Sequence, residues 1–123
     1  MPRDADTDQR SSRLLRGILD ACLLALISER DRYGYELAAA LHEAGLPIVR
    51  EGSIYPLLTR LGQRGLLDSY RAPATAGPQR RYYRLTAAGQ AELATAQAVW
   101  TDVATGVDAI LARHVTDDEG DEG

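Results

Sequence analysis

One short segment is dense in side chains that bind phosphate groups: Gln79, Arg80, Arg81 and Arg84. A guanidinium group can donate two parallel hydrogen bonds to a phosphate, so this segment suits a polyanion such as nucleic acid. The alternative is an ordinary solvated strand face. In an extended strand, Arg80 and Arg84 share one side, whereas Arg81 lies on the other with Tyr83 and Leu85. The three arginines therefore cannot all face DNA together, and we expect at least one to be structural.

A second group of polar side chains lies earlier in the chain, at the start or on the exposed side of a predicted helix: Ser53, Tyr55, Thr59 and Arg60. Hydroxyl and guanidinium groups at these positions can reach phosphates and base edges. Ser53 could instead cap the helix, and Tyr55 could instead be partly buried. Tyr33 and Tyr35 flank the start of the preceding helix, and we expect one ring to pack inward and Tyr35 to contact DNA.

The remaining reactive side chains do not form a set that supports catalysis or metal binding. The sequence offers no paired carboxylates and no Ser/His/Asp or Cys/His combination at a usable spacing. His42 and His114 are 72 positions apart, without companion ligands. The single Cys22 excludes an intrachain disulfide and is expected to be a buried, small hydrophobic residue on the apolar face of the first helix. The alternative is a redox sensor. We therefore predict a protein that is not an enzyme and has no cofactor.

Three stretches with apolar residues at helical spacing precede the arginine-rich segment. Gly45 and Gly65 stand where left-handed C-terminal residues belong, and Ser53 is predicted to cap the third helix with Pro56 in its first turn. The predicted helices are residues 13–27, 35–44 and 53–65. Residues 66–71 and 80–85 are predicted to form a hairpin with a long loop, and Thr86 to cap a final helix.

Three helices followed by a hairpin are the order of a winged helix-turn-helix, in which the third helix enters the major groove of DNA. The predicted fold class is mainly α with a small β-hairpin, plus one C-terminal dimerisation helix. We predict a flexible N-terminal arm over residues 1–10 and a winged helix-turn-helix DNA-binding domain over residues 11–86. The dimerisation helix is predicted over residues 87–115, and an acidic disordered tail over residues 116–123.

The net charge of −4 on 123 residues hides an uneven distribution. Residues 10–84 carry twelve Arg against seven acids, whereas residues 85–123 carry one Arg against eight acids. The local field, rather than the total charge, steers a polyanion, so the basic middle remains suited to DNA. The longest apolar run, Ala21–Ile27, is far shorter than a membrane span, and we expect a cytoplasmic protein without a membrane partner.

Several linked motifs within residues 14–89 resemble those of the PadR family of bacterial transcriptional regulators. They are YGYEL at Tyr33–Leu37, GSIYPLLTRL at Gly52–Leu61, GLL at Gly65–Leu67, GPQRRYYRLT at Gly77–Thr86, and Gly89. The resemblance implies a homodimer whose first and last helices form the interface and whose two winged domains grip one DNA operator. The single final helix is similar to that of the short-tailed branch of the family, which includes multidrug-sensing repressors.

Apolar residues on the first and last predicted helices form the expected dimer interface. On the last helix they recur at steps of three and four, as in a coiled-coil seam. The set is Leu14, Leu15, Ile18, Leu93, Ala96, Trp100, Val103, Val107 and Ile110. The alternative is that the last helix folds back on its own domain.

Trp100, the only tryptophan, is the expected centre of a ligand site. In the short-tailed relatives that the sequence resembles, a Trp at the matching place lines a pocket between the subunits in which flat aromatic compounds stack. Leu15, Ile18, Cys22 and Val103 are the expected walls, and the expected effector is a small aromatic or cationic molecule. The alternative is that Trp100 only stabilises the dimer.

The predicted function is that of a dimeric, sequence-specific DNA-binding regulator, a repressor released by a small planar ligand at the dimer interface. The alternative is a winged-helix module that binds proteins and not DNA. Binding to several phosphates weakens steeply as the salt concentration rises, whereas an apolar protein interface is much less sensitive, so salt dependence distinguishes the two.

Overall fold

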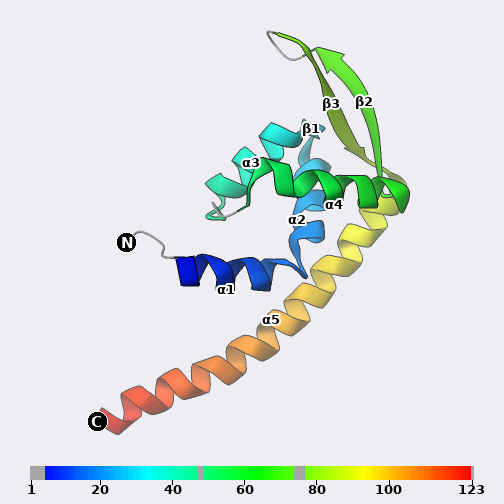
Figure 1. Ribbon diagram of the computed structural model, residues 1–123. Coiled ribbons are helices and arrows are strands. Elements are labelled where there is room, and N and C mark those ends of the chain that lie inside the picture. The colour runs from blue at the N-terminus through cyan, green and yellow to red at the C-terminus, as the bar shows by residue number, and fades with distance from the viewer. Residues whose placement is uncertain (1–4, 47–48, 74–76, 123) are drawn as a thin grey trace. The chain divides into compact units, whose positions relative to one another are not determined.

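Helices α2 (Leu19–Glu29), α3 (Gly34–Glu43) and α4 (Glu51–Gln63) pack beside a small antiparallel sheet, as Figure 1 shows. The computed structural model describes residues 5–46, 49–73 and 77–122. These residues form two units, divided after Leu93. The first unit also contains α1 (Ala5–Leu15) and the first turns of α5 (Ala87–Glu122). This mainly helical fold with a small sheet and a C-terminal helix is the predicted fold class.

Leucine and isoleucine side chains from the three packed helices form the core of the first unit. Residues that are fully or almost fully buried include Leu23, Leu24, Leu37, Leu41, Ile54, Leu58 and Leu61. Leu67 of the sheet and Leu93 of α5 are buried in the same cluster. Burial of such side chains stabilises a fold by about 1.5–3 kcal/mol each, so this cluster fixes α4 against α2 and α3.

Glycine ends both α3 and α4, as the sequence predicts. Gly45 and Gly65 have φ values of +96° and +77°, a region that is open to glycine but strained for other residues. The amide of Leu66, the residue after Gly65, donates to the carbonyl of Leu61 at 3.0 Å. This capping bond closes α4, and the chain then continues directly into the sheet.

Thr86 begins α5 and joins three elements, and the predicted cap is confirmed. The amide of Gly89 donates to Thr86 Oγ1 at 3.0 Å, while the Thr86 hydroxyl donates to the carbonyl of Gly65 at 2.7 Å. The backbone amide of Thr86 also donates to the carbonyl of Leu66 at 3.1 Å. The end of α4, the base of the sheet and the first turn of α5 are therefore held together by one residue.

The sheet has the strand order β1–β3–β2, with β1 (Arg32–Tyr33) at one edge. Strands β2 (Leu67–Pro73) and β3 (Gln79–Leu85) form the predicted hairpin, the wing, which reaches away from the helices in Figure 1. Residues 74–76 of the predicted loop lie outside the described residues. Strand β1 was not predicted, because two residues are too few to show an alternating pattern and their partners lie about 50 residues later in the chain.

Helix boundaries differ from the prediction at two places in the first unit. The helix predicted over residues 13–27 is divided into α1 and α2 at Arg16–Ile18, where Gly17 weakens the helical conformation. Helix α4 begins at Glu51, after Arg50, so Ser53 lies in its first turn and does not cap it. Pro56 consequently lies inside the helix and not in its first turn.

The two ends of the chain also differ from the predicted boundaries. Residues 1–4 of the expected flexible arm lie outside the described residues, but the chain is helical from Ala5, and an ion pair of 3.1 Å between Arg10 and Asp6 supports one turn. In the second unit, α5 continues to Glu122, seven residues past the boundary at residue 115. No proline interrupts residues 87–122, and a helix without a breaker can continue through polar sequence.

Candidate nucleic-acid interface

A cleft of about 460 Å³ lies between the start of α3, the start of α4 and the wing. It is lined by three tyrosines, two arginines and three other residues: Tyr33, Gly34, Tyr35, Glu51, Tyr55, Gln79, Arg80 and Arg81. Five of these, Tyr35, Tyr55, Gln79, Arg80 and Arg81, belong to the predicted DNA-binding set. The fold thus brings together residues from three separate segments. Among them, Tyr35, Gln79, Arg80 and Arg81 have side-chain groups that can donate to phosphate oxygens.

Tyr55 lines the cleft, and its ring packs against Gly34, the first residue of α3. A Cβ atom on Gly34 would lie only 2.6 Å from Tyr55 Cζ, so a larger residue at this position would displace the ring. The Tyr55 hydroxyl donates to Glu51 at 2.5 Å, and this hydrogen bond, with some burial, raises the pKa of Tyr55 to about 12. The phenol is therefore a neutral hydrogen-bond donor at physiological pH. Tyr35, with 61% of its surface exposed, lies open to solvent in the same cleft.

The arginines of the wing alternate between its two faces, as the strand periodicity predicts. Arg80 lies with its guanidinium carbon 5.7 Å from the centre of the Tyr33 ring, and Arg84 lies 5.3 Å from that of Tyr70. Arg81 points to the opposite face and donates to the Ser69 hydroxyl at 3.0 Å. These partners are neutral, so the wing arginines are held in place while their positive charge remains.

The other predicted DNA-binding residues do not join the cleft. The Ser53 hydroxyl donates to the carbonyl of Arg50 at 2.7 Å and lies beside a separate, largely apolar hollow. Arg60 lies 3.4 Å from the carboxylate of Asp20 on α2. Thr59 is exposed on α4, and Arg84 lies near the end of β3, at the base of the wing.

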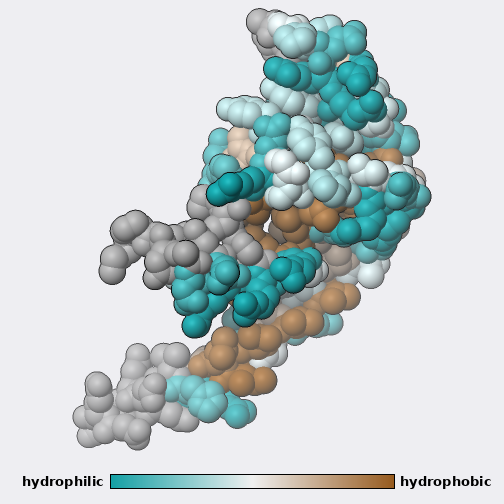
Figure 2. Space-filling view, in the orientation of Figure 1, coloured by the Kyte–Doolittle hydropathy of each residue, from teal (hydrophilic) through white to brown (hydrophobic). Residues whose placement is uncertain are grey.

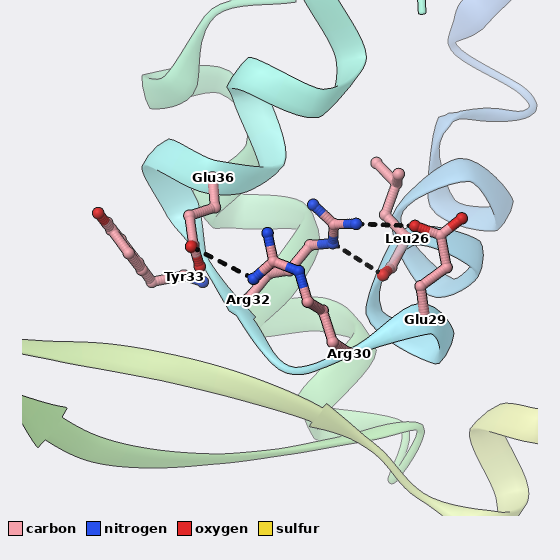
Figure 3. A network of polar contacts seen from close by, with 6 residues as sticks. All are labelled: Leu26, Glu29, Arg30, Arg32, Tyr33 and Glu36. Carbon is pink, nitrogen blue, oxygen red and sulfur yellow. Dashed lines mark hydrogen bonds and ion pairs between the residues drawn. The ribbon is translucent and has the colours of Figure 1, made fainter. Parts of the chain in front are cut away.

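Five arginines in the described helical part of the first unit pair with carboxylates: Arg10, Arg30, Arg32, Arg60 and Arg64. Figure 3 shows one such network between α2, β1 and α3. Arg32 lies 2.7 Å from Glu29 and also donates to the carbonyl of Leu26 at 3.0 Å. Arg30 lies 3.3 Å from Glu36, which also accepts a bond from the amide of Tyr33. The network fixes β1 and the start of α3, and thereby the position of Tyr33 and Tyr35 in the cleft.

Several residues of this interface were not predicted from the sequence. Arg71 of β2 lies directly opposite Arg81 and adds a further exposed positive charge to the wing. Tyr70 pairs with Tyr82 in the register of the hairpin, and its hydroxyl donates to Asp31 at 2.5 Å. The signal for Arg71 was its place at the end of the predicted strand over residues 66–71, beside the loop, whereas the contact of Tyr70 depends on strand register.

The apolar residues predicted to form the dimer interface lie in both units. In the second unit, Trp100, Val103, Val107 and Ile110 are each about half exposed, and Figure 2 shows the apolar row that they form along α5. In the first unit, Leu14 is 81% exposed. Leu15, Ile18 and Cys22, the expected pocket walls, are half-buried in that unit, and burial raises the pKa of the Cys22 thiol.

One residue of the predicted interface is placed differently. Leu93 is only 5% exposed and packs in the core of the first unit, so it does not belong to the exposed row of α5. Its spacing fits the row, but the division between the two units falls directly after it. Ala96 is the first residue of the row that remains partly exposed.

Helices α2–α4 with the wing define a winged helix-turn-helix, a class of DNA-binding module. The chain belongs to the PadR-like family of transcriptional regulators, because a sequence model of that family matches residues 23–95. It is therefore a DNA-binding transcriptional regulator and not an enzyme. The family assignment favours this function over a module that binds only proteins. Within the described residues, no helix is long and apolar enough to cross a membrane.

Solved structures agree with this assignment, and one further relative is similar in sequence. A PadR-like transcriptional regulator from Bacillus cereus is 38% identical with a TM-score of 0.75, over 80% of this chain and 96% of that chain. A transcriptional regulator from Streptococcus is 36% identical with a TM-score of 0.73, over 79% of this chain and 95% of that chain. A protein of Lysinibacillus sphaericus is 31% identical over 102 residues, which are 81% of this chain and 94% of the relative.

Proposed function

We propose that this regulator is a homodimer that binds an operator through α4 and the wing and represses transcription until a planar ligand releases it. The cleft supports the DNA-binding part of this proposal, because Tyr35, Tyr55 and Arg80, from three separate segments, all line it. Hydroxyl and guanidinium donors in one cleft suit the oxygens of a DNA backbone. The exposed side of α4, with Thr59 and Arg60, is the surface proposed to read base edges.

The test of DNA binding is an affinity measurement on operator fragments selected from genomic DNA by the purified protein. We expect an imperfect palindrome with half-sites roughly 10 bp apart, or a multiple of that spacing, because two α4 helices related by a two-fold axis read successive turns. Affinity should fall steeply with salt. Retention of no specific fragment, or an affinity independent of salt, would contradict the proposal.

Dimerisation is proposed from the exposed row on α5. Trp100, Val103, Val107 and Ile110 recur at steps of three and four, and burial of this row by a second copy would remove apolar surface from water. The test is sedimentation equilibrium at tens of micromolar, roughly above ordinary dimer dissociation constants. We expect a dimer for the natural sequence and a monomer for Val107→Asp. A monomer for the natural sequence would overturn this part of the proposal.

The ligand site is proposed around Trp100 and its symmetry mate. Trp100 is 52% exposed, and the small Ala96 lies one helical turn before it on the same row. Two large rings beside a small residue leave space that a planar aromatic or cationic guest can fill by stacking. Repression and its release by a ligand rest on the resemblance to multidrug-sensing repressors.

Fluorescence tests the ligand site directly, since Trp100 is the only tryptophan. Titration with planar cationic dyes should quench its emission, and the same dyes should release operator DNA and restore transcription in a reporter strain. Trp100→Phe keeps an aromatic ring in the row and serves as the control for dimerisation, whereas Trp100→Ala should lose the ligand response. An unchanged response in Trp100→Ala would leave Trp100 with a structural role only.

A further inference from the structure

Three tyrosines form a continuous row across one face of the sheet. Tyr33 of β1, Tyr82 of β3 and Tyr70 of β2 stand at paired register positions and therefore on the same face. The ring centres of Tyr33 and Tyr82 are 5.3 Å apart in an edge-to-face arrangement, and those of Tyr82 and Tyr70 are 5.7 Å apart and stacked. Both arrangements are favourable for aromatic pairs, so the row is a rigid support.

An arginine lies over each end of this row. The guanidinium of Arg80 lies over Tyr33, and that of Arg84 lies over Tyr70. Arg80 and Arg84 are four residues apart on one strand, which places their backbones about 13 Å from each other. Because each guanidinium also lies over a different ring, we assign each arginine a phosphate of its own.

The Tyr70 end of the row is tied to the helical part of the unit. The Tyr70 hydroxyl donates to the carboxylate of Asp31, in the segment between α2 and β1. This bond engages the hydroxyl with Asp31 and leaves only the ring to face Arg84. The hydrogen bond to Asp31 also raises the pKa of Tyr70, which keeps the phenol neutral.

We propose that Tyr33 and Tyr70 are positioning residues that hold Arg80 and Arg84 for contacts with two separate phosphates of bound DNA. The inference rests on the proposed DNA binding by the wing and deepens it. A free arginine side chain loses much conformational freedom when it binds, whereas one already held over a ring loses less. A tyrosine ring, unlike a carboxylate, does not cancel the charge of a guanidinium, so the row orders both arginines. Asp68 stands opposite Arg84 in the register of the hairpin and partly offsets its charge, whereas Arg80 stands opposite an alanine and keeps its full charge.

The experiment measures binding of the full chain to a fluorescent duplex of mixed sequence, about 30 bp or three helical turns long, at a series of salt concentrations. The variants are Tyr70→Leu, which removes the ring, Tyr70→Phe, which keeps it, Arg84→Ala, and Tyr70→Leu combined with Arg84→Ala. Thermal unfolding of each variant reports whether the fold is kept. The same set at Tyr33 and Arg80 forms an independent second cycle, which decides the question if Tyr70→Leu does not fold.

We expect Tyr70→Leu to weaken binding about two- to fivefold, the range of an exposed cation–π contact. The slope of log affinity against log salt should decrease by about 0.9 for each phosphate that the variant no longer neutralises. Tyr70→Phe should bind like the natural sequence, and the combined variant should bind no more weakly than Arg84→Ala alone.

Three results would overturn the positioning role while DNA binding stands. They are independent, additive losses from the Tyr and Arg substitutions, an affinity of Tyr70→Phe as low as that of Tyr70→Leu, and an unchanged affinity of both Arg80→Ala and Arg84→Ala. Failure of the natural sequence to bind any duplex would instead overturn the proposed function itself. The two failures are therefore distinguishable.

Discussion

The arginines of the helical region and those of the wing differ in their partners. In the helical region, Arg30, Arg32 and Arg60 lie 3.3, 2.7 and 3.4 Å from carboxylates. On the wing, Arg80 and Arg84 lie over tyrosine rings. A carboxylate cancels the charge that it orders, whereas a ring orders a charge and leaves it in place. We therefore propose that the partner of an arginine, and not its position in a basic segment, distinguishes structural arginines from those that bind DNA.

The largest expected effect is that of removing two wing charges. Arg80→Ala with Arg81→Ala should lower the affinity for duplex DNA at least about tenfold, because charge-assisted hydrogen bonds contribute about 1.5–3 kcal/mol each. Fluorescence anisotropy on a labelled duplex measures the loss. The matched control is Arg10→Ala with Arg64→Ala, which removes the same formal charge from arginines that are paired with Asp6 and Glu92, outside the cleft. Equal losses in both double variants would contradict the comparison.

Loss of stability is the main effect expected from Arg32→Ala. The Arg32 side chain is 12% exposed and bonds both Glu29 and the carbonyl of Leu26. Its removal should lower the free energy of unfolding by about 1–3 kcal/mol, because the partly buried carbonyl of Leu26 loses its donor and the packing of the Arg32 side chain is lost. Urea unfolding followed by circular dichroism measures the change. A midpoint equal to that of the natural sequence would show that this network does not stabilise the fold.

A smaller effect is expected from Asp20→Asn, which releases Arg60 from its carboxylate. The pair is largely exposed, so the free energy of unfolding should change by less than about 1 kcal/mol. If Arg60 faces DNA as the sequence predicts, its restored charge should tighten duplex binding about two- to threefold at low salt. Asp102→Asn removes an exposed carboxylate on α5, outside the wing, and is the control. An unchanged affinity in Asp20→Asn would assign Arg60 to the structural group.

The smallest effect concerns the one carboxylate among the cleft residues, Glu51, which pairs with a phenol and not with an arginine. The folded-state pKa of Tyr55 is raised to about 12, above the ordinary value of 10, so its contribution to stability is complete below pH 10. As pH rises from 10 to 12, the unfolded chain loses this proton first, and stability falls. Tyr55→Phe should therefore lose less stability over this pH range in urea titrations. An identical alkaline profile would show that the hydrogen bond to Glu51 is absent in solution.

Much of the fold followed from local sequence. Gly45, Gly65 and Thr86 marked the ends and the start of helices because their conformations and side-chain bonds depend only on neighbouring residues. The division between α1 and α2 was missed although Gly17 was visible, since apolar spacing continued across it. Strand β1 could not be predicted, because a two-residue strand exists only through its pairing with Tyr82 and Tyr83.

The types of residue in the candidate site could be predicted from the sequence, but the contacts between distant residues could not. Alternation along one strand correctly separated Arg81 from Arg80 and Arg84. The pairing of Arg60 with Asp20 joins residues 40 positions apart, and no local pattern reveals it. Leu93 matched the apolar spacing of α5 but belongs to the core. Spacing predicts which face of a helix a residue lies on, but it does not predict which other part of the molecule covers that face.

The bonds of Thr86 also determine where this chain can change in length during evolution. Its hydroxyl and amide connect to Gly65 and Leu66, and Gly89 packs so closely that an added Cβ would lie 2.6 Å from Leu85 Cδ1. One inserted residue between β3 and α5 would break all these contacts at once, whereas residues added near the exposed Gly77 would only lengthen the hairpin. Insertions among relatives should therefore accumulate at the tip of the wing and be absent around Thr86.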